Sequence, residues 1–221
     1  VQEDNADAVI QMLKGAMQQL QVGNPYLLKT DIGPVIDAEA QENIQKHIDK
    51  MRQKGHRVHQ LMRNDTQDSE LDAGTFIIPT LIELPNLNDL EREVFGPVLH
   101  VIRFNQGSLK QLLEHINSKG YGLTMGPHTR IDETIQTVMT HAEVGNLYIN
   151  RNIVGAVVGV QPFGGEGLSG TGPKAGGPIY LYRLMQNCSA KKLNKPFATG
   201  ADLNPQVEFS NSALFLEWAA K

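Results

Sequence analysis

The glycine-rich stretch at residues 162–178, PFGGEGLSGTGPKAGGP, contains the spacing of a known binding motif. Gly165, Gly167 and Gly170 stand in the G-x-G-x-x-G pattern of loops that hold a pyrophosphate. Such a loop needs a strand before it and a helix after it, because the phosphate binds free N–H groups at the helix N-terminus. We expect the strand, but the further glycines and prolines up to Pro178 prevent a helix from starting at once. A loop that turns tightly between packed elements is therefore favoured over a phosphate loop.

Two other groups of residues could do chemistry, and neither is supported by its surroundings. Cys188 is the only cysteine, which excludes an internal disulfide and a cysteine-rich metal site. We expect it near the end of a short helix, where the helix dipole disfavours a thiolate nucleophile. His56 and His59 form an H-x-x-H pair in a strand-like run with no evident third ligand. Ordinary surface histidines are favoured there over a metal site.

A pair of carboxylates stands before a rigid turn in the stretch LEREVFGPVLHV. Glu91 and Glu93 precede the turn formed by Phe95, Gly96 and Pro97, and a strand is expected to follow. A carboxylate beside such a turn can accept two hydrogen bonds from a ribose diol while an aromatic ring flanks the adjacent base. The alternative interpretation is a charged loop followed by a turn. These residues alone leave both interpretations open.

Two amphipathic helices are expected in the N-terminal part of the chain. Apolar residues recur at intervals of three and four over residues 9–20, and Asp4 or Asn5 is expected to cap this first helix. The second helix is predicted over residues 37–54, and Gly55 is a suitable stop after its basic last turn. The apolar stripe of the second helix consists of Ile44, Ile48 and Met51.

From residue 76 onward the pattern indicates strands that alternate with helices. The runs FIIPTLIEL and PVLHVIRF predict strands. Pro79 in the first run favours an edge strand or a bulge. A helix capped by Ser108, a strand at YGLTMG, a helix capped by Asp132 and a strand at VGNLYIN follow. This β-α-β-α-β order predicts a parallel sheet with ligand sites beyond the carboxyl ends of its strands. The inward-facing residues of the two helices are predicted to be Leu109, Leu112, Leu113, Ile116, Ile135, Val138, Met139 and Ala142.

Composition limits the class of protein. The 221 residues are 40% hydrophobic with a formal net charge of −4, which suits one or two globular domains. This charge provides no basic surface for nucleic acid and no polybasic membrane anchor, and no transmembrane segment or signal peptide is evident. We expect small-molecule or protein partners and a cytoplasmic location, with peripheral membrane association of the whole protein left open. Because Val1 is not a start residue, we expect the chain to begin partway through a larger protein.

Two long motifs resemble the C-terminal half of the aldehyde dehydrogenase superfamily. They are EVFGPV and GNLYINRNIVGAVVGVQPFGGEGLSGTGPKAGGP, and the second resembles specifically the L-glutamate γ-semialdehyde (pyrroline-5-carboxylate) dehydrogenase module of the proline utilization A family. VQEDNADAVIQMLKGAMQQLQVGNP and DIGPVIDAEA are similar to that family as well, so the resemblance covers about residues 1–185. It implies an α/β fold, the parallel-sheet catalytic domain of the aldehyde dehydrogenase fold, present as a C-terminal fragment without the Rossmann NAD domain.

The resemblance also implies roles for five residues. Glu93 matches the family acid that holds the nicotinamide ribose hydroxyls, and Phe95 matches the aromatic residue beside the nicotinamide. Gly155 and Ala156 match the anchor-loop pair whose backbone N–H groups bind the substrate's α-carboxylate. Phe163 matches the aromatic residue that packs against the aliphatic part of the substrate.

The reaction centre of the family is not expected in this chain. The family mechanism uses a cysteine thiolate as nucleophile, NAD⁺ as hydride acceptor and a glutamate as general base. The resemblance places the cysteine, the glutamate and the NAD domain upstream of Val1, and it places a proline dehydrogenase module with FAD outside the chain. Pro127 departs from the small or β-branched residue of the family pattern. Residues 1–189 are expected to be the C-terminal part of the catalytic domain, and residues 190–221 a linker and the start of a C-terminal extension.

Three hypotheses for function follow. The first is a part of an NAD-dependent glutamate γ-semialdehyde dehydrogenase in a bifunctional proline-oxidising enzyme, inactive alone and completed by the upstream half of the polypeptide. The second is a non-catalytic assembly or binding module, since the superfamily forms homo-oligomers through segments near its C-terminus. The third is an aldehyde dehydrogenase for a different substrate without a proline oxidase partner. Tight NAD⁺ binding by the isolated chain would contradict the second hypothesis, a non-catalytic module.

Overall fold

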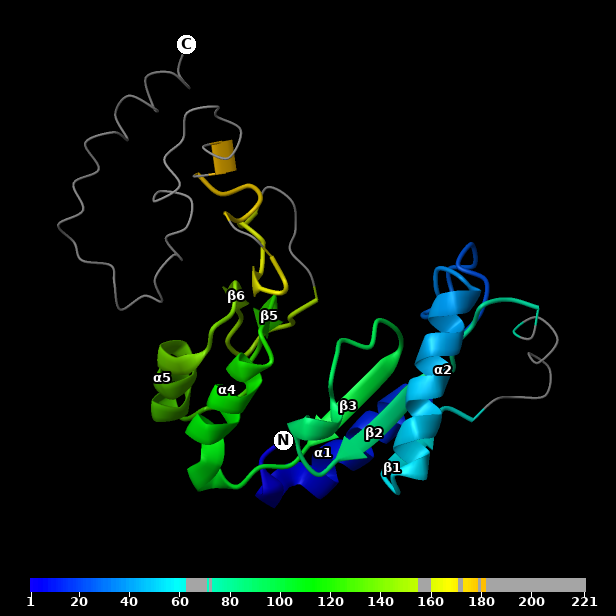
Figure 1. Ribbon diagram of the computed structural model, residues 1–221, viewed down its shortest axis with the longest axis horizontal. Helices are drawn as coiled ribbons and strands as arrows, with labels where there is room; N and C mark the ends of the chain where they lie inside the picture. The colour runs from blue at the N-terminus through cyan, green and yellow to red at the C-terminus, as the bar shows by residue number, and fades with distance from the viewer. Residues whose placement is uncertain (63–70, 72, 155–159, 171–172, 179, 182–221) are drawn as a thin grey trace, which may run out of the picture. The chain divides into compact units, whose positions relative to one another are not determined.

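The computed structural model divides the chain into two compact units, Val1–Leu109 and Lys110–Lys221, and each is considered by itself (Figure 1). The structure describes residues 1–62, 71, 73–154, 160–170, 173–178 and 180–181.

A three-stranded sheet lies at the centre of the first unit, in the order β1-β2-β3. β1 (Arg57–Gln60) runs antiparallel to β2 (Thr80–Leu84), which runs parallel to β3 (Val98–Ile102). The 3₁₀ turns η1 (Leu87–Asp89) and η2 (Gln106–Ser108) precede and follow β3 along the chain. Because β2 has a partner on each side and is almost wholly buried, it is the core strand of this unit.

Two helices pack on this sheet, α1 (Glu3–Met17) and α2 (Ala38–Gln53) (Figure 1). Successive side chains of a strand point to opposite faces of the sheet. Leu81 of β2 accordingly belongs to one apolar cluster with Ile10 of α1, whereas Ile82 belongs to another cluster with α2. The sheet is therefore the middle layer between the two helices.

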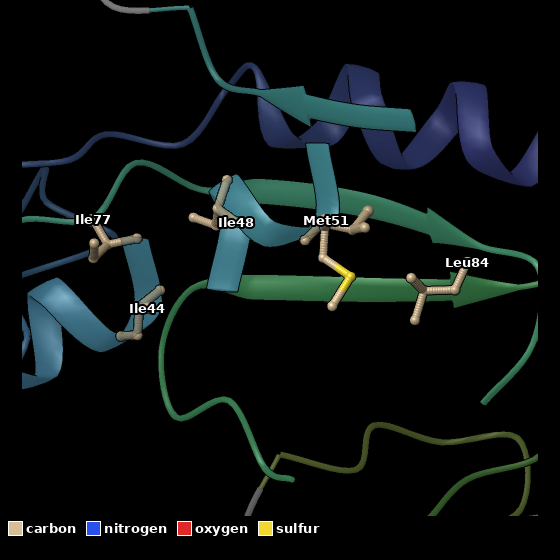
Figure 2. Packing of buried hydrophobic residues seen from close by; sticks show 6 residues of the cluster. Ile44, Ile48, Met51, Ile77 and Leu84 are labelled. Atoms are coloured by element: carbon tan, nitrogen blue, oxygen red, sulfur yellow. The ribbon is translucent and has the colours of Figure 1, made fainter. Parts of the chain in front are cut away.

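The second predicted helix is confirmed in both its ends and its buried face. The Asp37 side chain accepts a hydrogen bond from the N–H of Ala40 at 2.8 Å, and Gly55 follows the helix with a φ of 82°. Full burial of Ile48 contributes on the order of 1.5–3 kcal/mol. Figure 2 shows the α2 side of the core, in which the labelled side chains are Ile44, Ile48, Met51, Ile77 and Leu84.

Two predictions about the first unit are wrong. Helix α1 begins at Glu3 after Gln2 and has no side-chain cap, so Asp4 lies within its first turn, where a negative charge favours the helix dipole. Asn5 likewise lies inside the helix. Pro79 does not mark an edge strand, because β2 begins one residue later and the proline therefore removes no hydrogen bond from the ladder.

The second unit contains a parallel strand pair joined by a helix, as the alternating pattern predicts. β5 (Thr124–Met125) pairs in parallel with β6 (Asn146–Leu147), and α5 (Asp132–His141) connects them. Helix α4 (Leu109–Ser118) precedes β4 (Tyr121–Gly122). Among the residues of this unit that the structure describes, the buried apolar ones are Leu113, Val138, Ala142 and Tyr148.

Two details of the second unit differ from the predictions. The expected strand YGLTMG is split, because β4 pairs antiparallel with β7 (Glu166–Gly167) whereas β5 pairs with β6. The result is a mixed α/β arrangement with parallel elements. Asp132 is the first residue of α5 rather than its cap, which is Ile131. Met139, predicted to face inward, is 43% exposed.

Several predictions fall outside the described residues. They concern Cys188, the anchor pair Gly155 and Ala156, and the apolar run near the C-terminus. Within the part of the chain that the structure describes, no helix is both long and apolar enough to cross a bilayer.

Candidate functional site

The loop that carries Glu93 and Phe95 lies between η1 and β3 in the first unit. The loop is tightly turned, because the N–H of Gly96 donates to the carbonyl of Val94 at 3.1 Å and the N–H of Val98 donates to the carbonyl of Gly96 at 2.7 Å. The side chains of Glu93 and Phe95 are both exposed, and Phe95 retains 85% of its accessible surface. The turn thus presents a carboxylate and an aromatic ring at the surface, where a ligand can reach them.

A hollow of about 220 Å³ separates this loop from helix α2. Its loop wall is formed by residues 92–95, and its helix wall includes Asn43, Ile44 and His47. Carboxylate, amide and imidazole groups around a small concave surface suit a hydroxylated ligand, and Phe95 provides a flat apolar surface beside them. Among the described residues, Glu93 forms no ion pair that would compete with such a ligand.

Asn43 and His47 also line this hollow, and the sequence analysis did not identify them. They lie four residues apart, one turn of α2, so the helix places both on the same face. The only local signal was this spacing of two polar residues beside the buried stripe of Ile44 and Ile48. Which loop this face meets depends on how α2 packs on the sheet, and that information is not local.

His47 contacts a second histidine, His100 of β3. The two Nε2 atoms are 2.8 Å apart and the rings meet edge to face. Burial, and after it the charge of His47, lower the pKa of His100 to about 4. Burial also lowers the pKa of His47, and the charges of Lys50 and Arg92 add to this effect. Both rings are therefore neutral at physiological pH, and one Nε2–H donates a hydrogen bond to the Nε2 of the other ring.

We expect this pair to make the first unit less stable in acid. The folded pKa of His100 is about 4 and its ordinary value is 6.5, so the unfolded state binds more protons and stability falls as pH decreases between these values. The loss attributable to His100 should be about 1–2 kcal/mol, discounted because the ring is partly exposed. Hydrogen exchange of α2 amides at about pH 7 and about pH 5 measures it. His100→Gln should lose distinctly less stability than the wild type, and equal losses would contradict the prediction.

The second candidate place lies in the second unit, around Phe163. Phe163 is half-buried and forms two backbone hydrogen bonds with Ala175, of 3.0 and 2.9 Å. Asn146 of β6 holds the same segment, because its Nδ2 donates to the carbonyl of Pro162 at 3.0 Å and its Oδ1 accepts from the N–H of Gly164 at 3.2 Å. The backbone on both sides of Phe163 is thereby fixed against β6.

A larger hollow of about 540 Å³ lies beside this segment. Tyr148 and Pro162 line it, together with two cationic residues, Arg151 and Lys174. The Arg151 guanidinium lies 4.8 Å from the centre of the Tyr148 ring, and the Lys174 ammonium donates to the carbonyl of Gly145. Within the described residues the wall of this hollow has cationic and neutral groups but no carboxylate, which favours an anionic ligand.

The glycine-rich stretch is a close-packed turn. A Cβ atom added to Gly165, Gly167 or Gly170 would lie 2.3–2.5 Å from a backbone carbonyl oxygen, and Gly167 has a φ of 60°. Gly167 moreover belongs to strand β7, and no α-helix is formed by the described residues that follow it. The prediction of a loop turning between packed elements is confirmed, and a phosphate loop is not supported.

The two histidines of the H-x-x-H pair have separate partners. His59 Nε2 lies 3.3 Å from a carboxylate oxygen of Glu83 on β2. His56 Nε2 is 3.0 Å from Asp89 Oδ2, although the two groups are not aligned for a hydrogen bond. Within the part of the chain that the structure describes, no group of three or more ligating residues could hold a metal ion.

Both long motifs lie within a stretch of the chain that matches a known family. The sequence model of the aldehyde dehydrogenase family matches residues 1–189. The chain belongs to the aldehyde dehydrogenase family. Its mixed α/β arrangement with parallel strands is that of aldehyde dehydrogenase modules of solved structure.

Within the aldehyde dehydrogenase family, the proteins to which this chain is similar include PutA proteins and 1-pyrroline-5-carboxylate dehydrogenases. It is 60% identical over 199 residues to the bifunctional protein PutA of Klebsiella aerogenes, covering 90% of this chain and 15% of PutA. It is 38% identical over 197 residues to the 1-pyrroline-5-carboxylate dehydrogenase of Geobacillus kaustophilus, covering 88% of this chain and 36% of that enzyme. A crystal structure of a mutant of Bradyrhizobium japonicum proline utilization A (PutA) is 48% identical, with a TM-score of 0.74 over 82% of this chain and 18% of that one. The chain thus spans about one seventh of the length of the PutA relatives it matches.

The structure places three of the five predicted site residues of this aldehyde dehydrogenase chain. Glu93 and Phe95 lie together on one loop of the first unit, and Phe163 lies in the second unit. Gly155 and Ala156 are outside the described residues. The roles of all five remain predictions.

Proposed function

We propose that this chain is part of an NAD-dependent L-glutamate γ-semialdehyde dehydrogenase, within a longer polypeptide that also oxidises proline. Its similarity to PutA, 60% identity over 199 residues, is the observation that carries this proposal. The similarity to 1-pyrroline-5-carboxylate dehydrogenases supports the same substrate. The hollow beside Glu93 supports a cofactor with a ribose, because it combines an exposed carboxylate with a flat aromatic surface.

The residues present fit the nicotinamide end of NAD⁺. The Glu93 carboxylate would accept hydrogen bonds from the two ribose hydroxyls, and Asn43 across the hollow offers both a donor and an acceptor. Phe95, exposed beside them, would lie against the nicotinamide side. When bound, NAD⁺ supplies the acceptor for the hydride of the aldehyde.

The residues proposed to bind the substrate belong to the second unit, which is considered by itself. The N–H groups of Gly155 and Ala156 would bind the carboxylate of the semialdehyde, and the Phe163 ring would pack against its aliphatic chain. The hydrogen bonds that fix the backbone on both sides of Phe163 support a rigid wall at this position.

We further propose that the remainder of the machinery lies elsewhere in the polypeptide. A nucleophilic cysteine, a general-base glutamate and a Rossmann NAD domain would come from upstream, and FAD would serve the proline-oxidising module. Residues 190–221 are proposed to form a linker and the start of an extension, which is supported by the end of the family match at residue 189. A cytoplasmic homo-oligomer is the proposed state of the whole protein.

The test is NAD⁺ reduction by the whole polypeptide with glutamate γ-semialdehyde as substrate. We expect turnover with this aldehyde, a lower kcat/KM with butanal, and no turnover by residues 1–221 alone. Activity with butanal but none with the semialdehyde would overturn the substrate assignment. Absence of NAD⁺ reduction with both aldehydes would overturn the proposed enzyme.

A further inference from the structure

Two loops follow the parallel strands β5 and β6 at the same edge of the second unit. The first is formed by residues 126–129 and the second by residues 148–154. Parallel strands joined by a helix end on the same side of a sheet, and ligands bind beyond those ends. The second loop leads directly into Gly155 and Ala156, the proposed carboxylate anchor.

Asn150 joins these two loops through three hydrogen bonds. Its Oδ1 accepts from the N–H of Thr129 at 2.8 Å, and its Nδ2 donates to the carbonyl of Thr129 at 2.9 Å. Its own N–H donates to the carbonyl of Pro127 at 3.0 Å. The side-chain amide thus pairs with Thr129 as a neighbouring strand would. Pro127, which departs from the family pattern, accepts one of the three hydrogen bonds between the loops through its carbonyl oxygen.

The backbone of Asn150 is strained. With a φ of 54° it is the only non-glycine residue with positive φ in the described part of the chain. The left-handed conformation is strained for most residues, and asparagine is among those that tolerate it best. Such strain persists where surrounding bonds fix the conformation, and it is concentrated at functional sites.

Gly126 provides a second connection between the same loops. A Cβ atom at this position would lie 2.2 Å from Cγ2 of Ile153, so the Ile153 side chain occupies the space that any larger residue would need. Ile153 stands two residues before the proposed anchor pair. The segment leading to the anchor is therefore attached to the first loop at both Asn150 and Ile153.

We infer that Asn150 is a positioning residue for the carboxylate anchor, and that it thereby sets the preference for aldehydes that bear a distal carboxylate. This inference rests on the proposed function. Asn150 itself does not contact the substrate; it holds the start of the anchor segment against the loop at Pro127 and Thr129. Displacing the segment should weaken carboxylate binding far more than it slows reaction of an aldehyde without one.

The decisive variant is Asn150→Gly in the whole polypeptide. Glycine adopts the positive φ without strain. This change therefore removes the two hydrogen bonds of the Asn150 side-chain amide and leaves the fold intact. We expect the ratio of kcat/KM for glutamate γ-semialdehyde over butanal to fall about tenfold or more, because misplacing a positioned group by about 1 Å has effects up to a hundredfold. The change should appear mainly as a higher KM for the semialdehyde, with kcat for butanal nearly unchanged.

Asn117→Ala is the matched control. Asn117 also bridges two backbone groups of the second unit with its amide, since Nδ2 donates to the carbonyl of His141 at 2.7 Å and Oδ1 accepts from the N–H of Glu143 at 3.2 Å. This variant should lower the melting temperature but leave unchanged the ratio of kcat/KM for glutamate γ-semialdehyde over that for butanal. If Asn150→Gly does the same, its role is only structural and the inference is overturned. A wild type without preference for the semialdehyde would show, before any variant is compared, that the proposed function itself is wrong.

Discussion

Gly145→Ala is expected to prevent the second unit from folding stably. A Cβ atom at Gly145 would lie 1.8 Å from the carbonyl oxygen of Gly164 and 2.9 Å from Cα of Gly165. These are backbone atoms, and Asn146 is hydrogen-bonded to the backbone of both Pro162 and Gly164, so moving this segment away would break those bonds. We expect a loss of about 3 kcal/mol or more in the free energy of unfolding, since overpacking against a fixed backbone is at the upper end of single-residue effects.

Chemical denaturation and the yield of soluble protein measure this loss. Gly15→Ala is the control, because Gly15 lies inside helix α1 and a Cβ atom there meets no other atom within 4 Å. That change should stabilise helix α1 by about 1 kcal/mol or slightly less. A Gly145→Ala protein as stable as the wild type would show that β6 and the glycine-rich stretch are not in close contact.

Glu93→Ala is expected to raise the KM for NAD⁺ by about ten- to a hundredfold. Removing a carboxylate that accepts hydrogen bonds from two hydroxyls costs about 1.5–3 kcal/mol, and each 1.4 kcal/mol is a factor of ten in affinity. Steady-state kinetics of the whole polypeptide with varied NAD⁺ provides the measurement. The KM for the aldehyde should change little, because the substrate contacts are proposed on other residues.

The neighbouring carboxylate supplies the control for this prediction. Glu91 forms an exposed ion pair with Lys50 at 3.1 Å and does not line the hollow beside Phe95. Glu91→Ala should alter the KM for NAD⁺ by less than about threefold, since exposed ion pairs contribute little. Equal effects of the two substitutions would indicate a general electrostatic influence and contradict the ribose contact.

Sequence periodicity predicted helix α2 accurately because its signals are local. Asp37 caps its own helix, Gly55 ends it, and the apolar stripe at intervals of three and four must face a core whatever that core is. The same holds for the parallel pair β5 and β6, whose alternation with a helix requires a crossover connection. The predicted caps, Asp4 or Asn5 for α1 and Asp132 for α5, were wrong by one to three residues.

Sequence patterns did not predict which segments pair across the chain. The YGLTMG run has one apolar pattern, but Gly122 belongs to a strand that pairs with β7 while Met125 pairs with β6. Pro79 favoured an edge strand or a bulge, whereas the tertiary structure begins the central strand directly after it. Strand partners are non-local, so a pattern of a few residues does not contain them.

The sequence by itself determined the family, the glycine-rich stretch and the candidate carboxylate Glu93, because these follow from residue types at fixed spacings. The tertiary structure alone decided that α2 supplies Asn43 and His47 opposite that carboxylate. It also decided that Asn150 joins two loops across 21 residues, with a backbone conformation that no sequence pattern specifies. The physical reason is that side-chain hydrogen bonds and packing contacts between distant segments form only after the sheets and helices have brought those segments together.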